Sequence, residues 1–253
     1  MSQPITGDDS VRIAMWSGPR NLSTAMMRAW ENRPDTAVVD EPFYACYLKF
    51  SGAKHPFRDE VLAGQSSDWH AVARKLTAET PGGRRIFYQK HMTHHMLPEA
   101  PLEWLERVSH AFLIRHPQEV SASWAHALKS VPSLDELGYV RQVELFDRIA
   151  DTRGEAPPVF DSRDVLERPE PALRALCNAL RVPFDERMLS WPEGPRETDG
   201  VWAPHWYQSV WRSSGFGPAR RQAQPAPELL PVIDAALPFY ERLAQHRIPV
   251  EGQ

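Results

Sequence analysis

One segment of the sequence combines the residue types that bind phosphate or sulfate groups. Residues 17–24 (SGPRNLST) follow the apolar run 11–16 and precede a stretch of helical periodicity. Backbone N–H groups at a helix start, aided by the helix dipole, attract anions. Arg20 adds a fixed positive charge whose planar fork matches the oxygens of a phosphate or sulfate. The segment therefore predicts an anion-binding loop made of Ser17, Gly18, Pro19, Arg20, Asn21, Leu22, Ser23 and Thr24.

The same segment has a simpler interpretation. It lacks the G-x-x-x-x-G-K-[ST] pattern of ATP- and GTP-binding loops. A serine or threonine such as Ser23 or Thr24 is a common cap at the start of a helix. From this segment alone, an ordinary capped turn between a strand and a helix stays open as the alternative.

A second candidate lies at the end of the apolar run 110–114, where Arg115 is followed eight residues later by Ser123. Ligands of open α/β sheets bind outside the carboxyl ends of the strands, so Arg115 could meet a second phosphate there. Ser123 would fall near the second turn of the following helix and could reach the same group. An arginine at a strand end is also often part of a surface ion pair, and this alternative stays open.

A carboxylate follows another short apolar run. Residues 36–40 (TAVVD) lead into Asp40-Glu41-Pro42, and Glu41 at a strand end would face the same crevice as the anion-binding loop. A carboxylate in that place could act as a general base on an acceptor hydroxyl. The alternatives are a solvated loop acid or an ion-pair partner for Arg20.

Lys90 and His91 end a further run, and His94 and His95 follow closely. The spacing resembles a metal cluster only superficially, because no carboxylate or cysteine follows at ligand spacing and no HExxH pattern is present. We therefore predict no metal site. The better interpretation is that Lys90 or His91 reaches into the crevice and assists a reacting group.

These side chains need a scaffold that brings strand ends together. Short apolar runs bounded by turn residues indicate buried strands at residues 11–16, 36–40, 85–89, 110–114 and 158–161. Helical periodicity predicts a helix from about Ala25 to Arg33 and further helices at residues 69–79, 118–129, 139–153, 170–180 and 228–245. The apolar stripe of the last helix is predicted to be Leu230, Ile233, Leu237 and Tyr240.

Strands that alternate with helices imply parallel pairing. We predict an α/β fold with three layers, α/β/α, around a central, mostly parallel sheet. One domain should span residues 1–253, with polar residues 1–10 frayed. Residues 191–225, rich in Trp, Gly, Pro and Arg, should form an irregular segment that covers the site.

Bulk composition argues against several protein classes. The 253 residues include 29 basic and 33 acidic ones, for a net charge of -4, whereas a general nucleic-acid binder usually has a basic excess. Cys46 and Cys177 are too few for a disulfide framework and too far apart for a zinc site, which indicates buried thiols in a reducing cytoplasm. The sequence shows neither the apolar length of a membrane span nor the pattern of a signal peptide, so we expect a cytoplasmic protein.

Taken together, these segments resemble the sulfotransferase family that uses 3′-phosphoadenosine 5′-phosphosulfate (PAPS). The loop looks like the 5′-phosphosulfate loop of bacterial members, usually written P-R-S-G-T-S. Pro19-Arg20 fall on its Pro-Arg and Ser23-Thr24 on its hydroxyl pair, while Asn21 and Leu22 replace its Ser and Gly. The family's P-loop-nucleotide-hydrolase-like fold agrees with the predicted layers.

The other segments extend this resemblance over most of the chain. Arg115 and Ser123 reproduce the Arg-x₇-Ser spacing of the family's 3′-phosphate motif. Residues 40–43 resemble the segment that carries the base carboxylate in bacterial carbohydrate sulfotransferases, and Lys90 lies where many members carry a strand-end lysine. The aromatic stretch 200–216 is loosely similar to the C-terminal loop that covers the cofactor, although it could equally line an acceptor site or be a packed flap.

The resemblance implies a PAPS-dependent sulfotransferase that releases adenosine 3′,5′-bisphosphate. Its acceptor would be a hydroxyl, in preference to an amine, of an unidentified small molecule or carbohydrate. Arg20 would hold the 5′-phosphate and the developing charge, Glu41 would take the acceptor proton, and Lys90 or His91 would assist the sulfuryl oxygens or orient the acceptor. Arg115 and Ser123 would select for the 3′-phosphate, and no metal is required.

Two other functions stay open from the sequence. A nucleotide-dependent phosphotransferase (a kinase) could use the same loop, and a non-catalytic nucleotide-binding protein could keep the same fold. The sequence does not reveal the acceptor, the role of His94 and His95, or the oligomeric state, a homodimer included.

Overall fold

The computed structural model of the chain describes residues 10–218 and 224–250. Within these residues the centre is one sheet made of β1 (Val11–Ser17), β2 (Thr36–Asp40), β3 (Ile86–Met92), β4 (Ser109–Ile114) and β5 (Val159–Asp161). The spatial order is β2-β3-β1-β4-β5, and every neighbouring pair is parallel. The predicted strands and their parallel pairing are confirmed.

Helices and short turns connect the strands. The α-helices are α1 (Ser23–Glu31), α2 (Tyr44–Ser51), α3 (Arg58–Gly64), α4 (Trp69–Thr77), α5 (Pro117–Leu128), α6 (Leu134–Leu137), α7 (Tyr139–Arg153), α8 (Ser162–Glu167), α9 (Pro169–Ala179), α10 (Ala203–Trp206), α11 (Gln208–Trp211) and α12 (Leu230–Ala244). The 3₁₀ turns are η1 (Pro81–Gly83), η2 (Thr93–His95), η3 (Glu103–Arg107), η4 (Glu186–Leu189) and η5 (Pro227–Leu229). None of the helices in the described ranges is long and apolar enough to cross a membrane.

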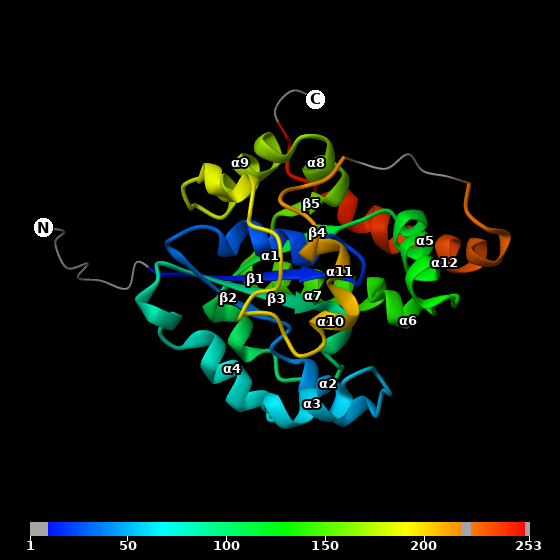
Figure 1. The fold of residues 1–253 in the computed structure, drawn as a ribbon, viewed down its shortest axis with the longest axis horizontal. Helices are drawn as coiled ribbons and strands as arrows, with labels where there is room; N and C mark the ends of the chain where they lie inside the picture. The colour runs from blue at the N-terminus through cyan, green and yellow to red at the C-terminus, as the bar shows by residue number, and fades with distance from the viewer. Residues whose placement is uncertain (1–9, 219–223, 251–253) are drawn as a thin grey trace, which may run out of the picture.

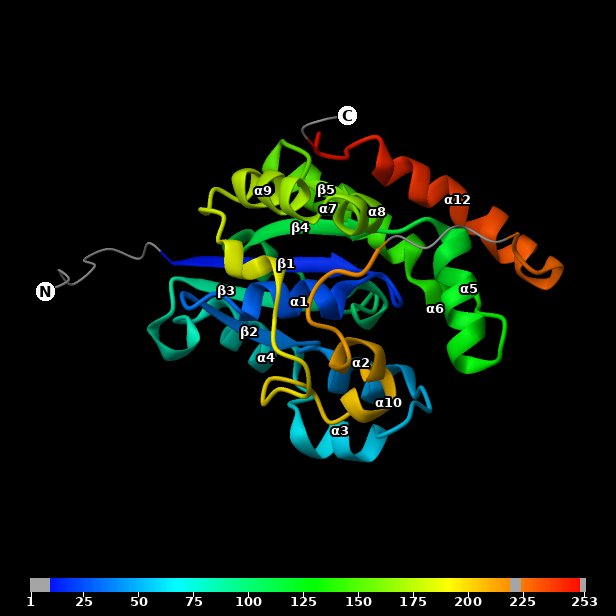
Figure 2. The same ribbon diagram turned by 45° about the horizontal axis from the view of Figure 1, so that its top comes forward.

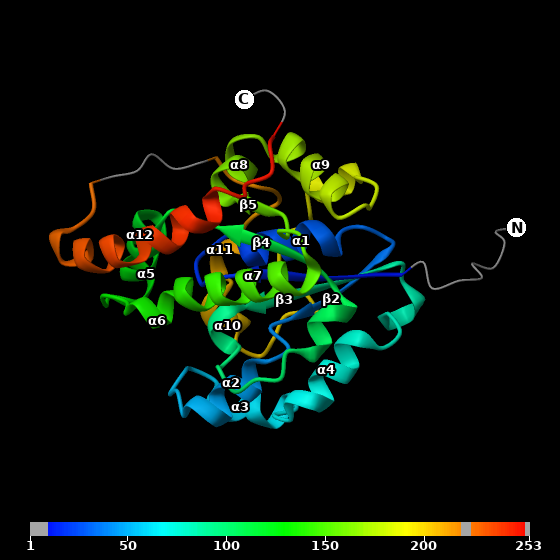
Figure 3. The same cartoon turned by 180° about the vertical axis from the view of Figure 1, so that it is seen from behind.

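Helices cover both faces of the sheet. Strand side chains alternate between the faces: α1, α8 and α9 pack over Met15 and Leu113, whereas α4, α7 and the end of α12 pack over Trp16 and Phe112. Figure 3 shows α4 and α7 on the second of these faces. The three-layer α/β/α architecture is confirmed. Beside the sheet, α2, α3 and α10 pack against one another (Figure 2).

Parallel pairing gathers the carboxyl ends of the strands at one edge of the sheet. Ser17 at the end of β1 lies opposite Met92 of β3 and Leu113 of β4, and Asp40 at the end of β2 lies opposite Lys90. In Figure 1 the arrow of β1 points toward the side of the molecule where α10, α11 and α6 lie. The predicted site segments therefore meet at this edge.

Strand β3 extends beyond its predicted end. It continues through Lys90 and His91 to Met92, and all of its residues are buried. A lysine inside a buried strand is costly unless its charge is paired. Asp40 of β2 lies directly opposite Lys90, so the partner that allows the strand to continue comes from another strand.

The apolar stripe of α12 agrees with the predicted one only in part, at Ile233 and at the partly buried Tyr240. Leu230 is 43% exposed, whereas Val232, Ile233, Ala236 and Leu243 are buried. Val232 and Ala236 pack against α5 and the α6–α7 junction. Apolar residues occupy both faces of this helix in the sequence, so the packing partners, rather than the periodicity, determine which face is buried.

Gly18, directly after β1, leaves no space for a side chain. A Cβ built on it would lie 2.6 Å from the backbone carbonyl oxygen of Leu137. We expect Gly18→Ala to lower the free energy of unfolding by about 1–3 kcal/mol, because a backbone atom must shift to admit the methyl group. Urea denaturation measures this change. Gly64→Ala in α3 is the matched control, since a Cβ there meets no atom within 4 Å, and equal stability of the two variants would contradict the crowding at Gly18.

Candidate active site

The loop between β1 and α1 holds an uncommon backbone shape. Arg20 and Leu22 both adopt left-handed angles, with φ of 57° and 64°. Such angles cost roughly 1–2 kcal/mol for a residue with a side chain, so the contacts around the loop must hold them. Leu22 stands where the P-R-S-G-T-S pattern has glycine, and its positive φ is the conformation that glycine adopts freely. Leu22 is thus compatible with the same turn.

Helix α1 begins with uncapped amide groups. Its first internal hydrogen bond runs from the N–H of Met26 to the carbonyl of Leu22 at 3.0 Å. No side chain caps this end, and the first turn contains no acidic residue. The N–H groups of residues 23–25 therefore have no partner inside the helix, which favours an anion at this end.

Two guanidinium groups meet beside the loop. Nε of Arg20 donates to Oγ of Ser123 at 3.1 Å, and Nη1 of Arg115 donates to the backbone carbonyl of Arg20 at 2.8 Å. Burial, together with the nearby charge of Arg115, lowers the pKa of Arg20. The fold thus brings together three predicted residues, although Ser123 lies 103 positions after Arg20. An anion held between the two cations would relieve their repulsion.

Arg115 also has a counter-ion within the protein. Its Nε donates to Oε2 of Glu119 on α5 at 2.9 Å, and the other oxygen of Glu119 accepts from Arg163 at 2.9 Å. The side chain of Arg115 is 19% exposed. The sequence left open that Arg115 belongs to a surface ion pair. The ion pair exists, but it is largely buried and adjoins the predicted anion-binding loop.

Two loop side chains point into the protein. Asn21 is 2% exposed, and its Nδ2 donates to the carbonyl of Leu113 at 2.7 Å. The Oγ of the fully buried Ser17 lies 4.0 Å from Sδ of Met92. Asn21 fixes the loop to the end of β4. Of the predicted ligands, Ser17 and Asn21 could therefore contact an anion only through their backbone.

A buried lysine joins the ends of β2 and β3 to the C-terminal segment. Nζ of Lys90 donates to Oδ1 of Asp40 at 2.8 Å, to Oε1 of Glu41 at 2.7 Å and to the hydroxyl of Tyr207 at 2.6 Å. An ammonium group has three protons, so each has a partner. The side chains of Lys90 and Asp40 are 1% exposed and that of Glu41 is 11% exposed. Glu41 is therefore the charged group of this cluster nearest the exterior.

Tyr207 completes the cluster from the aromatic stretch 200–216. Its hydroxyl donates to Oδ2 of Asp40 at 2.7 Å and accepts from the indole N–H of Trp202 at 3.1 Å. The sequence did not single out Tyr207, because Lys90 lies 117 positions earlier and nothing in the spacing distinguishes this tyrosine from the aromatic residues around it. The stretch packs against the sheet edge and contributes to the site.

The cluster contains two carboxyl groups and one ammonium group. Burial raises the pKa of Glu41 above its ordinary value, with Lys90 opposing the rise and Asp40 adding to it. Burial by itself would lower the pKa of Lys90, but the charges of Asp40 and Glu41 raise it, so Lys90 stays charged. Glu41 is thus a carboxylate with increased proton affinity, as a general base requires.

His91 does not reach this cluster. Successive side chains of a strand face opposite ways, and the ring of His91 stacks on Trp16 with 4.5 Å between centroids and also contacts Phe43 and Trp104. Burial lowers the pKa of His91 to about 3, so the ring is neutral. The structure contradicts the prediction that His91 assists a reacting group, because this side chain belongs to the core on the opposite face.

His94 and His95 lie in η2, beside two tyrosines of α2. The ring of His95 stacks on those of Tyr44 and Tyr47, with centroids 4.5 Å and 4.9 Å away. Its Nδ1 lies 4.0 Å from Oε2 of Glu41. Over residues 10–218 and 224–250, no three His, Cys, Asp or Glu side chains are grouped as a metal ion would require.

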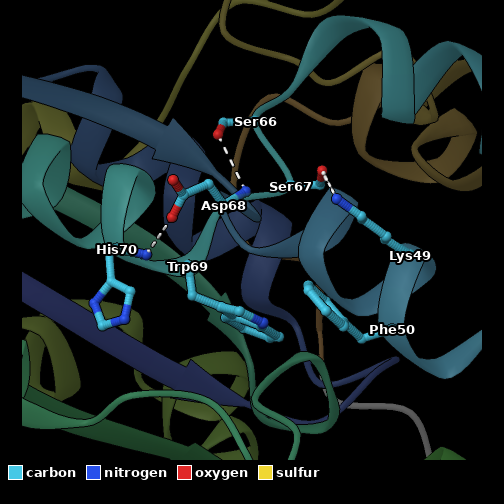
Figure 4. Close-up of a pocket in the computed structure, with 7 residues that line it drawn as sticks. All are labelled: Lys49, Phe50, Ser66, Ser67, Asp68, Trp69 and His70. Carbon is cyan, nitrogen blue, oxygen red and sulfur yellow. Dashed lines mark hydrogen bonds between the residues drawn. The ribbon is translucent and has the colours of Figure 1, made fainter.

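A surface pocket of about 370 Å³ lies between α2 and the start of α4 (Figure 4). Phe50 and Trp69 stack there with centroids 5.9 Å apart, and Lys49 donates to Ser67 at 3.2 Å. None of the predicted site residues lines this pocket. We therefore place the candidate active site at the sheet edge, where the cationic loop and the buried carboxylates lie.

Comparison with known proteins adds independent information. The family model described as "Sulfotransferase domain" matches residues 11–247. "Branched-chain-amino-acid aminotransferase-like protein 1" of Arabidopsis thaliana is 37% identical over 235 residues, which are 92% of this chain and 42% of that protein. "Branched-chain-amino-acid aminotransferase-like protein 2" of the same plant is 34% identical over 235 residues, which are 92% of this chain and 41% of that protein. This chain therefore spans less than half the length of these plant relatives.

Two solved structures have a similar fold at low sequence identity. The sulfotransferase domain from the Synechococcus PCC 7002 olefin synthase is 16% identical with a TM-score of 0.57, covering 98% of this chain and 99% of that one. The sulfotransferase from Alicyclobacillus acidocaldarius is 14% identical with a TM-score of 0.55, covering 94% and 97%. At these identities the likeness concerns the fold.

We expect Lys90→Met to lower the free energy of unfolding by about 3–5 kcal/mol, because it leaves the carboxylates of Asp40 and Glu41 buried without their counter-ion. Chemical denaturation measures the loss. Adding Asp40→Asn to Lys90→Met should restore part of the stability, since an amide needs no counter-ion. Lys49→Met, on the surface of α2, is the control and should change stability by less than about 0.5 kcal/mol. Similar stability of the two lysine variants would show that the cluster does not depend on the ammonium group.

Proposed function

The chain belongs to the sulfotransferase domain family, and we propose that it moves a sulfuryl group from PAPS to a hydroxyl group of a small-molecule or carbohydrate acceptor. The observation that carries the proposal is the meeting of two unlike centres at one sheet edge. A cationic loop with Arg20 and Arg115 lies at the ends of β1 and β4. A buried carboxylate with raised proton affinity, Glu41, follows the end of β2.

The donor suits the chemistry of the loop. Helix α1 presents uncapped amides, so the backbone itself can face a phosphate. A nucleotide with phosphate at both the 5′ and 3′ positions would engage Arg20 and the α1 amides with one group, and Arg115 and Ser123 with the other. ATP lacks a 3′-phosphate, so Arg115 and Ser123 would select PAPS over ATP.

In the proposed reaction the acceptor oxygen attacks the sulfur atom, and the bond from sulfur to the bridging oxygen of the donor breaks. The acceptor proton passes to Glu41, and the electron pair of the broken bond stays on the 5′-phosphate of adenosine 3′,5′-bisphosphate. By analogy with phosphoryl transfer, positioning and charge stabilisation supply most of the catalysis. Arg20 and the α1 amides would stabilise the charge that develops on the leaving oxygen.

Lys90 would act through Glu41 in this reaction. Its three protons are directed to Asp40, Glu41 and Tyr207, so a direct hydrogen bond to the sulfuryl oxygens would require breaking one of these bonds. The ammonium group favours the ionised form of Glu41, and its bond to Oε1 orients the carboxylate. We therefore propose that Lys90 is a positioning residue, in place of the direct role suggested by its strand-end location.

Isothermal titration calorimetry tests the donor site. We expect adenosine 3′,5′-bisphosphate to bind, and Arg115→Ala to weaken its binding by about 10- to 100-fold, the effect of one or two charged hydrogen bonds. AMP lacks the 3′-phosphate, so its affinity should change by less than about threefold. Arg163→Ala is the matched control, because Arg163 contacts the same Glu119 from α8.

Two results of this titration would count against the proposal. No heat with the bisphosphate at high micromolar concentration would contradict the donor, and magnesium-dependent binding of ATP in its place would favour a phosphotransferase. If Arg115→Ala weakened the binding of the bisphosphate and of AMP equally, Arg115 would not be a ligand of the 3′-phosphate.

We expect Glu41→Gln to retain bisphosphate binding and to lower kcat by about 10²- to 10⁴-fold, the usual contribution of a general base. The base must be ionised, and burial raises its pKa, so wild-type kcat should fall as the pH drops through a value above 4.5, the ordinary pKa of glutamate. Release of the bisphosphate from PAPS, with 7-hydroxy-4-methylcoumarin as a phenolic probe, provides the measurement. Glu99→Gln on the surface is the control, and a Glu41→Gln rate equal to that of this control would remove Glu41 from the reaction.

A further inference from the structure

His95 places a polar atom without a partner beside the proposed base. Its side chain is 3% exposed, and its Nδ1 lies 4.0 Å from Oε2 of Glu41. Within the described chain this nitrogen is buried and has no hydrogen bond. The stacked rings of Tyr44 and Tyr47 hold the imidazole. An unpaired buried polar atom costs about 1–3 kcal/mol, so a ligand group that pairs with Nδ1 would recover this free energy.

One oxygen of the Glu41 carboxylate is in a similar situation. Within the described residues, the hydrogen bond from Lys90 at 2.7 Å and the 3.4 Å contact with the hydroxyl of Tyr207, whose proton is donated to Asp40, both fall on Oε1. Oε2 instead faces His95. Glu41 is the most exposed charged group of the cluster, so it is the charged group that an acceptor can approach.

We propose that Oε2 of Glu41 and Nδ1 of His95 together hold the acceptor oxygen, and that this pair selects a hydroxyl acceptor over an amine. Because these two atoms are 4.0 Å apart, one oxygen can be at hydrogen-bond distance, about 2.8 Å, from both. The hydroxyl donates its proton to Oε2 and accepts a hydrogen bond from Nδ1–H. This inference rests on the proposed function and defines the chemical class of its acceptor.

The charge of Glu41 determines which nitrogen of His95 carries the proton. Burial, followed by the neighbouring His94 and His55, lowers the pKa of His95, so the ring is neutral and has one N–H and one bare nitrogen. A bare Nδ1 would direct its lone pair at the carboxylate, whereas Nδ1–H directs the positive end of its dipole there. Nδ1–H is therefore the favoured form.

A hydroxyl oxygen can satisfy this pair and still react. One lone pair accepts from Nδ1–H, the other attacks sulfur, and the O–H proton passes to Glu41. An amine nitrogen has a single lone pair, so it cannot accept from Nδ1–H and attack sulfur at the same time. An amine would leave the buried N–H of His95 unpaired, which corresponds to a preference for the hydroxyl of roughly tenfold or more.

Nuclear magnetic resonance of the full chain with ¹⁵N-labelled histidine tests the tautomer without turnover. The His95 signals are assigned by their loss in His95→Asn. In a sample that contains bound adenosine 3′,5′-bisphosphate, we expect the proton on Nδ1 and a bare Nε2, and we expect Glu41→Gln to weaken this preference. A proton on Nε2 would overturn the inference. Bisphosphate binding in the same sample would show that the proposed function survives that result.

Two probes of the same shape test the selectivity. 7-Hydroxy-4-methylcoumarin and 7-amino-4-methylcoumarin differ only in the attacking group. With PAPS, the hydroxyl probe should react at least about tenfold faster in the wild type, and the ratio should fall below about threefold in His95→Leu. His95→Asn should keep most of the ratio, because its amide can donate from near the position of Nδ1.

His94→Leu is the matched control for these probes, because it changes the adjacent histidine of η2 and should leave the ratio as in the wild type. Equal rates with the two coumarins in the wild type would overturn the inference. So would a ratio that His95→Leu leaves unchanged, since the selection would then come from other residues. If neither coumarin reacts, the nuclear magnetic resonance measurement of the His95 tautomer becomes the test of the inference.

Discussion

The buried ammonium group of Lys90 is the interaction on which the rest of the site depends. A charge in the interior is tolerated only when its attraction to partners offsets the loss of water, and three partners surround this one. They come from the end of β2, from the turn that follows it and from the C-terminal segment. Removing any partner would leave the others buried with unbalanced charge or an unpaired polar group, so the charge requirement holds these distant segments in one place.

This constraint also explains the backbone around it. Glu41 has a positive φ of 43°, an uncommon conformation that persists only where surrounding contacts enforce it. Its N–H donates to the carbonyl of Lys90 at 3.0 Å, so backbone and side chain both tie it to β3. On the other side, Arg28 of α1 donates to Asp199 at 2.5 Å, which anchors the segment that delivers Tyr207. Glu41 is therefore held by β3 of the sheet and, through Tyr207, by a segment anchored to α1.

Local patterns in the sequence predicted the strands, their parallel pairing and most of the long helices, but not the order of the strands in the sheet. They also led to Arg20, Arg115 and Ser123, which the fold brings into contact, because each follows an apolar run or lies at a fixed spacing in the next helix. The sequence could not show which way a side chain faces at the end of a strand. For this reason His91 was predicted in the crevice, although the alternation of β3 turns it into the core. Tyr207 could not be predicted, since its role arises from a contact between segments far apart in the chain.

The strand order sets how the two centres could cooperate. β3 lies between β1 and β2, so the loop after β1 and the carboxylate after β2 start about two strand spacings, or roughly 10 Å, apart. A proposed path from donor phosphorus to sulfur, to the acceptor oxygen and to the base has three steps of about 3 Å each, which matches this span. Lys90, on the middle strand, would then lie nearest the transferred group. Its hydrogen bonds are taken by its partners and its charge by Asp40 and Glu41, so its effect on the reaction would pass through the orientation and charge of Glu41. The strand-end lysine would thereby serve the proposed base, whereas the loop after β1 would serve the transferred group.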